Sequence, residues 1–395
     1  MSDEGVARNV PYEQFNQHGI DGLGNVRRAW RELGANAQYF FQTPEWMDHA
    51  AALIEGDLAW GVLTESGRPA AVSVLRHSQR KRAGIGFRAL EEARVGDWLY
   101  PYTDCVLDRK AGGRRTVDLD DVAGISGPWD VLDLRALRVG SPWIELAVGR
   151  AYLQEEPDGG VGILGTCLGS DDWGRALPKN MRDSIRKARG RIEESGGSQV
   201  IVSTGAGLPA AYEQFVALEA SGWKGAEGTA LSLRPAMQGL LRDYLSNAGT
   251  AQIRSLLVGD RLAASQVGVT VGGSLFLLKV AYDEQLAHLS PGNVLMVNLV
   301  EECCDDPEVD RIDCTVWQKW HQRWGMVREP TYRLLAFNHR SVGGVVAGAA
   351  WHTRRFLTQQ RGWRIAEAEG KRNSAWLQGG QTPSTGYGDW VERTG

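Results

Sequence analysis

The chain has 395 residues, of which 43% are apolar and 23% are charged, and its formal net charge is −4. These values are ordinary for a globular protein, and the slight acidity argues against a general nucleic-acid binder. No apolar run approaches the roughly 18 residues that a membrane-spanning helix needs, so no membrane insertion is expected. The five cysteines include no Cys-x-x-Cys pair and the N-terminus does not resemble a signal peptide, which favours reduced thiols in the cytoplasm.

The N-terminal part of the chain predicts two helices followed by a series of strands. Apolar residues share one face of a helix over 25–33, and Thr43-Pro44 is a typical start for a second helix that reaches about residue 53. The basic residues of 76–82 are interpreted as a solvated loop. A Ser-Pro helix start also occurs at Ser141. The strands expected in this part are 58–64, 69–75, 99–106, 129–134 and 161–167.

A basic amphipathic helix is predicted over 180–194. Its apolar side chains recur three or four residues apart, which places them on one face. The remaining surface carries five cations, which are either solvated or available to an anionic substrate: Arg182, Arg186, Lys187, Arg189 and Arg191.

The next segment joins a predicted helix over 208–221 to a glycine-rich stretch, 222–230. Glycines allow the backbone to lie close to a ligand, while Trp223 offers a flat face and Lys224 a cation. As a bare pattern this stretch is as typical of a structural loop as of a site. The other elements expected here are a helix over 235–247 and strands over 199–203, 253–258, 261–271 and 274–281.

Ser290-Pro291-Gly292 predicts the start of a helix that ends near Asp305-Asp306-Pro307. We expect Ser290 to cap it and Pro291 to take its first position. The free N–H groups and positive dipole of such a start favour an anion, although most capped helices bind nothing. A strand over 311–316, a polar-aromatic cluster over 317–324, a strand over 331–337, a helix over 345–361 and a flexible tail complete the chain.

Several familiar catalytic patterns are missing from the sequence. There is no convincing dinucleotide-binding or P-loop glycine motif, no HExxH or Cys/His quartet, and no GxSxG elbow. No metal is therefore expected, and a serine hydrolase is disfavoured.

The second half of the chain resembles GNAT-superfamily acyltransferases of the cellulose-biosynthesis-associated (CelD-like) type. The residues that carry the resemblance are Trp223-Lys224-Gly225, Tyr282-Asp283-Glu284, Ser290-Pro291-Gly292, Asp313, and Lys319 with Trp320 or Trp324. One departure is Gln318, where the family usually has Tyr. The resemblance implies an α+β fold of two tandem GNAT-like domains, each a mixed, mostly antiparallel sheet flanked by helices. We expect an N-terminal domain over 1–170, a catalytic domain over 171–345, and a terminal helix and tail over 346–395.

The resemblance further implies direct transfer of an acetyl or other acyl group from acyl-CoA to an amine of a small molecule or sugar. The implied catalytic residues are Asp283, Asp313, Lys319 and Glu219. The residues implied to bind the acyl-CoA are Ser290, Pro291, Gly292 and Asn293. Those implied to line the acceptor cleft are Trp223, Lys224, Tyr282, Trp317 and Trp320. Each carboxylate can equally serve only in turn or strand-end hydrogen bonds.

Two alternatives stay open at the level of sequence. A Fem-type transferase shares the paired GNAT layout but takes an amino acid from aminoacyl-tRNA, and the basic helix over 180–191 suits an RNA partner. A non-catalytic GNAT scaffold that binds a partner is the other, and Gln318 is a sign of lost chemistry in that interpretation.

Overall fold

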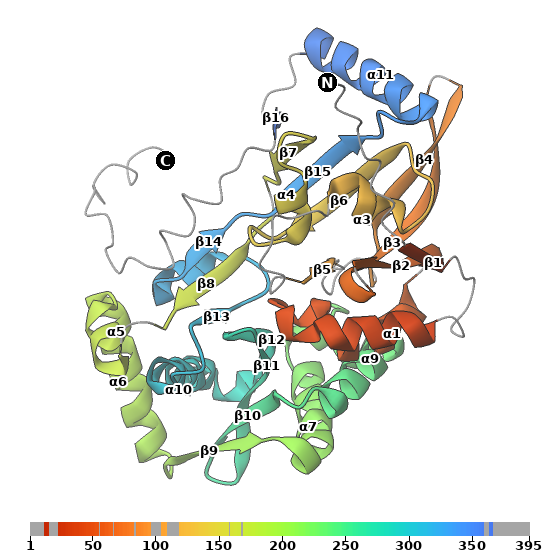
Figure 1. Cartoon of the computed structure of the whole chain (residues 1–395). Coiled ribbons are helices and arrows are strands. Elements are labelled where there is room, and N and C mark those ends of the chain that lie inside the picture. The colour runs from red at the N-terminus through yellow and green to blue at the C-terminus, as the bar shows by residue number, and fades with distance from the viewer. Residues whose placement is uncertain are drawn as a thin grey trace.

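The computed structural model describes residues 12–15, 23–54, 56–65, 67–82, 84–95, 104–108, 118–157, 159–166, 169–358 and 363–365. In this part of the chain the strands form two mixed sheets flanked by helices (Figure 1). The predicted α+β fold class is therefore confirmed. Most of residues 1–22, the start of the strand expected at 99–106, the end of the strand expected at 161–167, and the expected tail lie outside the described residues.

The first sheet has the strand order β1-β2-β3-β4-β6-β15-β7-β16, with β5 beside β3. Its described pairs are antiparallel except for the parallel pair β4–β6. The bounds are β1 Tyr12–Phe15, β2 Asp57–Glu65, β3 Arg68–Arg82, β4 Ile85–Glu92, β5 Val106–Leu107, β6 Val131–Leu137, β7 Ala151–Glu155, β15 Tyr332–Phe337 and β16 Trp363–Ile365.

The loop expected at 76–82 is wrong, because these residues continue β3 and pair with β4. Alternation along a strand sends Arg76, Ser78 and Arg80 to one face, where they bond to Glu91 of β4. The basic run is thus neutralised by a carboxylate from the neighbouring strand, which a reading of the run by itself does not reveal.

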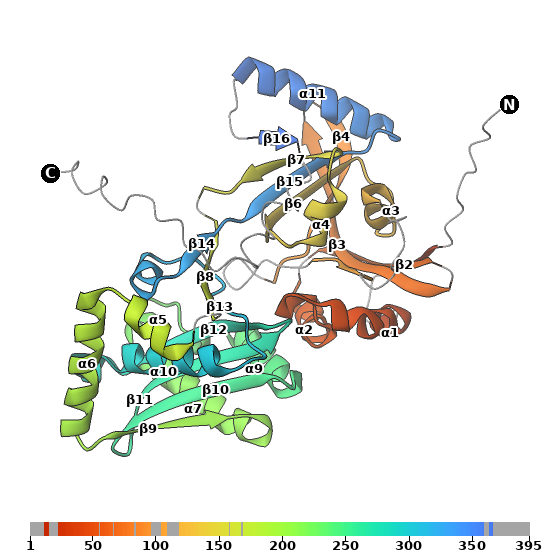
Figure 2. The same cartoon turned by 60° about the vertical axis from the view of Figure 1, so that its left-hand side comes forward.

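Helices cover both faces of the first sheet. On one face lie α3 (Leu119–Gly124) and α4 (Pro142–Leu146), in one apolar core with β4 and β6. On the other lies α11 (Val342–Thr358), far from the second sheet in Figure 2. The predicted start of α4 is confirmed, since the Ser141 hydroxyl accepts a hydrogen bond from the Trp143 N–H at 3.2 Å.

The second sheet has the order β14-β8-β13-β12-β11-β10-β9. Its strands are β8 Val161–Gly165, β9 Ser198–Ser203, β10 Ala251–Val258, β11 Arg261–Val271, β12 Ser274–Tyr282, β13 Arg311–Asp313 and β14 Val327–Glu329. Its helices are α5 Ser170–Ala176, α6 Lys179–Glu194, α7 Leu208–Ser221, α8 Trp223–Ala226, α9 Pro235–Asn247 and α10 Pro291–Asp305. Side chains of α7 and α9 join one core with this sheet, and those of α6 and α10 join others.

Strands β12 and β13 run parallel only over 274–276 and 311–313. The predicted strand over 311–316 stops early because Thr315 takes a left-handed conformation, with φ of 59°. The second half of β12 therefore has no strand beside it on that edge within the described residues. A gap of this kind exposes backbone and side chains in the middle of a sheet.

Two strands do not follow the expected linear division at residue 170. Strand β8 precedes that boundary but lies between β13 and β14 in the second sheet, and β15, within 171–345, lies between β6 and β7 in the first. The chain therefore passes from one sheet to the other and back.

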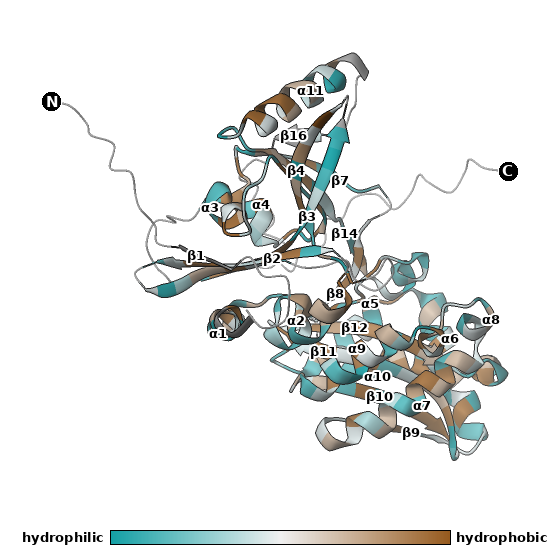
Figure 3. Cartoon of the chain, turned by 90° about the vertical axis from the view of Figure 1, so that its right-hand side faces the viewer, coloured by the Kyte–Doolittle hydropathy of each residue, from teal (hydrophilic) through white to brown (hydrophobic). Residues whose placement is uncertain are grey.

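The two halves also share a hydrophobic core. Helices α1 (Leu23–Leu33) and α2 (Pro44–Ala50) lie between the first sheet and the helices of the second (Figure 2). The rings of Trp46 and Tyr244 are 5.2 Å apart, and those of Phe40 and Phe276 are 5.4 Å apart. Figure 3 shows both hydrophobic and polar colours on α1, as expected for a helix with one buried stripe. The predicted Thr43 cap of α2 is confirmed by a hydrogen bond from the Trp46 N–H.

Candidate functional site

A cavity of about 500 Å³ opens beside the unpaired half of β12. Its walls come from the first turn of α10, from the ends of β12 and α7, from α8, and from a 3₁₀ helix, η8 (Lys319–Trp324). Because no described strand lies on the β13 edge of β12 there, the cavity reaches from the α10 face of the sheet to the α7 face. Nine predicted site residues line it: Glu219, Trp223, Lys224, Tyr282, Ser290, Pro291, Gly292, Asn293 and Trp320.

The first turn of α10 forms one wall of this cavity. The helix begins at Pro291 as predicted, but the expected cap is wrong: Ser290 is left-handed, with φ of 54°, and its side chain accepts no capping hydrogen bond. Its carbonyl instead accepts from the N–H groups of Asn293 and Val294. The Gly292 N–H has no hydrogen-bond partner among the described residues. The start of α10 thus presents a free donor at the positive end of the helix dipole.

Glu219 lies at the opposite wall, at the end of α7, with its side chain fully buried. One carboxylate oxygen is 2.9 Å from Lys224 Nζ and 3.6 Å from Lys279 Nζ. The other accepts the Leu231 N–H at 2.9 Å. Burial lowers the pKa of Lys279 to about 8, against the opposing pull of the Glu219 charge. The cluster therefore combines a buried carboxylate with an amine that can lose its proton near neutral pH.

Aromatic side chains form the rim of the cavity. Trp223 is 48% exposed and Tyr282 is 40% exposed, although both are large apolar groups. Trp320 is half-buried and lies against the ring of His321, at 4.0 Å between centroids. Burial lowers the pKa of His321 to about 4, so this imidazole is a neutral support for the rim. Trp317 also contacts His321 but does not line the cavity.

Three of the predicted catalytic residues lie outside the cavity lining. Asp283 accepts the Gln285 N–H and forms an ion pair with Arg261. Asp313 is buried, pairs with Arg138 at 2.7 Å and accepts the Thr315 N–H. Lys319 is exposed at the start of η8. Of the four candidates, Glu219 is the one that the fold brings to the cavity.

Three further polar residues line the cavity although sequence reasoning did not select them: Ser265, Gln266 and Arg323. Arg323 stands three residues after Trp320 in η8, and this spacing aligns side chains in a 3₁₀ helix, so the period was a usable signal. Gln266 of β11 is buried, and its Oε1 has no hydrogen-bond partner among the described residues. No local pattern marks Gln266, because its environment is made by α10 across the sheet.

Among the described residues, no group of three or more His, Cys, Asp or Glu side chains is arranged to hold a metal ion. Within the same ranges, no helix has the length and apolar character needed to cross a membrane.

The part of the chain that supplies most of the cavity lining is similar to a known enzyme family. Residues 179–319 match the family described as "Acetyltransferase (GNAT) domain". This segment includes α6 to α10, β9 to β13 and eight of the nine predicted residues that line the cavity, and Trp320 follows it directly. No curated protein sequence matches the chain.

Solved structures are similar at low sequence identity. FemX has 9% identity over 78% of this chain and 95% of its own, with a TM-score of 0.49. The C-terminal domain of a putative lysylphosphatidylglycerol synthetase from Agrobacterium fabrum has 10% identity over 82% and 95%, with a TM-score of 0.47. A tandem GNAT protein from the clavulanic acid biosynthesis pathway has 11% identity over 79% and 95%, with a TM-score of 0.38. Residues 179–319 are thus similar to GNAT acetyltransferase domains, and this match supports an acyltransferase.

Proposed function

We propose that this chain transfers an acyl group from acyl-CoA, with acetyl-CoA as the simplest donor, to a primary amine of a small molecule or sugar. The observation that carries the proposal is the course of the cavity, which runs from the start of α10 on one face of the sheet to the buried Glu219 on the other. A phosphorylated donor and an amine acceptor can therefore approach one point from opposite faces.

The α10 side of the cavity suits a phosphorylated donor that contains amide groups. The Gly292 N–H and the Arg323 guanidinium offer donors to phosphate. The buried Gln266 Oε1 lacks a partner in the described structure, which is costly unless a ligand supplies one, and a donor amide N–H would do so. Lys319, at the exposed start of η8, is a further cation for the phosphate end.

The α7 side of the cavity suits an amine. An ammonium must lose a proton before its nitrogen can attack a thioester carbonyl, so a proton acceptor must lie nearby. We assign this task to Glu219, with Lys279 as the neighbouring group whose pKa of about 8 lets the pair change protonation at working pH. Trp223 and Lys224 then form the acceptor side of the rim. The carboxylates of Asp283 and Asp313 accept hydrogen bonds from backbone N–H groups, and we assign them no role in the reaction.

Two other hypotheses, an aminoacyl-tRNA donor and membership of the CelD-like type, have support from the sequence alone. The basic helix that would contact tRNA is α6, and three of its arginines have partners inside the protein. Arg182 donates to two backbone carbonyls, Arg186 pairs with Asp183, and Arg189 pairs with Glu301. These bonds weaken the case for an RNA surface, so acyl-CoA stays the preferred donor.

The test uses the full chain with two donors in parallel. Acetyl-CoA and a panel of primary amines form one reaction, and charged tRNA with the same amines forms the other, with products identified by mass spectrometry. Calorimetric titration with CoA measures donor binding independently of the acceptor. We expect CoA to bind and at least one amine to gain an acetyl group. Failure to bind CoA, together with transfer from charged tRNA, would reverse the choice of donor.

A further inference from the structure

A second cavity of about 450 Å³ lies on the α7 face of the second sheet. Strands β9, β10 and β11 line it from below, and Gln214, Ala217 and Leu218 of α7 line it from the side. Leu218 also lines the first cavity, so one side chain forms a wall of both. The next residue along α7 is Glu219, the proposed proton acceptor.

A single row of paired residues runs beneath both cavities. Ile201 pairs with Ser255, Ser255 with Ser265, and Ser265 with Ala281 across β9, β10, β11 and β12. Directly opposite residues point to the same face of a sheet. Ile201 and Ser255 line the second cavity, while Ser265 and Ala281 line the first.

The residues of this row explain why space remains under the end of α7. Ser255, Ser265 and Ala281 are small, so the sheet surface is low where the helix crosses it. The hydroxyls of Ser255 and Ser265 lie 3.3 Å apart and can bond to each other, so neither hydroxyl needs a hydrogen-bond partner from a ligand. With strands about 4.8 Å apart, the row from Ile201 to Ala281 is roughly 14 Å long.

We propose that this row is the floor of a trough that holds an apolar arm of the acceptor, so that the substrate is a primary amine with a linear aliphatic chain or a similar apolar group. The inference rests on the proposed function and narrows its substrate. The occupant follows from the side of the sheet, because the second cavity adjoins the α7 side of the first across Leu218, whereas the groups that suit donor phosphates lie on the α10 side. The second cavity is lined by no Lys or Arg and by one acid, Asp260, so an anionic arm is disfavoured. Five of its nine lining residues are apolar, which favours an apolar arm: Ile201, Ala217, Leu218, Leu257 and Leu262.

The experiment measures kcat/KM for acetyl transfer from acetyl-CoA to n-propylamine, n-hexylamine and n-decylamine. Burial of each added methylene is expected to raise kcat/KM by roughly threefold until the trough is full. In the variant Ala217→Phe, a ring enters the trough from an exposed helix position. We expect the preference for decylamine over propylamine to fall at least about tenfold in this variant.

The matched control is Glu213→Phe, which adds the same ring to α7 outside both cavities and should keep the wild-type preference. Thermal unfolding of both variants checks that they fold. Equal kcat/KM for the three amines in the wild-type protein would overturn the trough while leaving the proposed function intact. The same assay with longer acyl-CoA donors tests the other occupant. If kcat/KM rises with the acyl length of the donor and Ala217→Phe removes this rise, the trough holds the donor and the proposal is overturned. Absence of CoA binding would overturn the proposed function and this inference together.

Discussion

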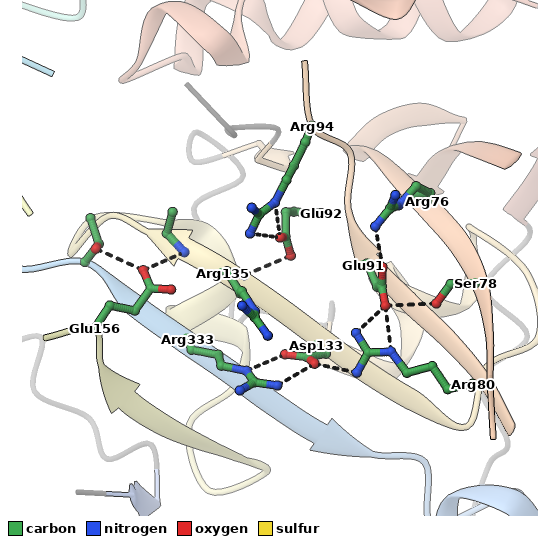
Figure 4. A network of polar contacts seen from close by, with 12 residues as sticks. Arg76, Ser78, Arg80, Glu91, Glu92, Arg94, Asp133, Arg135, Glu156 and Arg333 are labelled. Atoms are coloured by element: carbon green, nitrogen blue, oxygen red, sulfur yellow. Dashed lines mark hydrogen bonds and ion pairs between the residues drawn. The ribbon is translucent and has the colours of Figure 1, made fainter. Parts of the chain in front are cut away.

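Each half of this protein has a cluster in which buried carboxylate groups lie next to cations, and the two clusters have different surroundings. In the first sheet, Glu91 bonds to Arg76, Ser78 and Arg80, and Asp133 bonds to Arg80 and Arg333 (Figure 4). Beside the second sheet, Glu219 at the end of α7 pairs with two lysines and accepts a backbone N–H, but it also lines a cavity.

The partners determine the acidity in the first cluster. Burial raises the pKa of Glu91, but the hydrogen bond from Ser78 and the charge of Arg80 outweigh it, and the pKa falls below its usual value. Burial raises the pKa of Asp133 as well, but the hydrogen bonds and charges of Arg333 and Arg80 outweigh this effect, and the pKa falls below its usual value. These carboxylates stay ionised and fully paired, which suits a structural link between β3, β4, β6 and β15. The comparison teaches that buried charge marks a reactive site only when the charge also meets accessible space.

The largest expected effect separates the two clusters by activity. Glu219→Gln keeps the size of the side chain but removes the proton acceptor, so kcat should fall by about 10²- to 10³-fold. Steady-state kinetics with acetyl-CoA and the best amine of the panel measures it. The control is Glu213→Gln, an exposed position on the same helix, which should retain wild-type kcat. Wild-type kcat in Glu219→Gln would remove this residue from the mechanism.

The second prediction concerns stability. Asp133→Asn leaves two arginines without their shared carboxylate, and breaking such a buried pair costs about 3–5 kcal/mol. Because both arginines are partly exposed, we expect a loss of about 2 kcal/mol in the free energy of unfolding. Urea denaturation measures this loss, and kcat per folded molecule should not change. A large fall in kcat at full stability would indicate that the first sheet takes part in the reaction.

The third prediction uses pH. The pKa of Lys279 is lowered to about 8, so its neutral form grows as pH rises through that value. If the Glu219–Lys279 pair accepts the proton, kcat/KM should rise about eightfold between pH 7 and pH 8.5, apart from titration of the amine itself. Lys279→Met should flatten the step. In the first cluster the carboxylates have lowered pKa values, so their contribution to stability is lost only as pH falls through those values in the acid range. A profile for Lys279→Met that keeps the step near pH 8 would assign it to another group.

The smallest expected effect belongs to the donor side of the cavity. Arg323 is exposed, so its contact with phosphate is screened by solvent and salt. Arg323→Ala should raise the KM for acetyl-CoA about three- to fivefold with little change in kcat. Repetition at higher salt should narrow the difference between variant and wild type. A fall in kcat at constant KM would place Arg323 at the reacting atoms instead.

The sequence predicted the parts of the site that depend on local signals. Pro291 begins α10 because a proline is tolerated at the first helical position. The stretch from Trp223 lies at the cavity as the short helix α8, where Gly225 allows a close approach to the backbone of α7. The fold class followed from strand and helix patterns together with the family resemblance.

The parts that were missed depend on residues distant in the chain. Strand β3 continues through basic residues because Glu91 and Asp133 come from other strands. Asp313 is held by Arg138, 175 positions earlier in the sequence. The places of β8 and β15 likewise depend on sheet pairing that no short pattern records.

The crossing of β8 into the second sheet has a practical consequence. A fragment that starts at residue 171 would lose the strand between β13 and β14, and each of these would have an open edge where its partner stood. A fragment that ends before residue 332 would remove the strand between β6 and β7 in the same way. Neither half can therefore be cut out and kept as an independent module, and heat should melt both together in one cooperative transition.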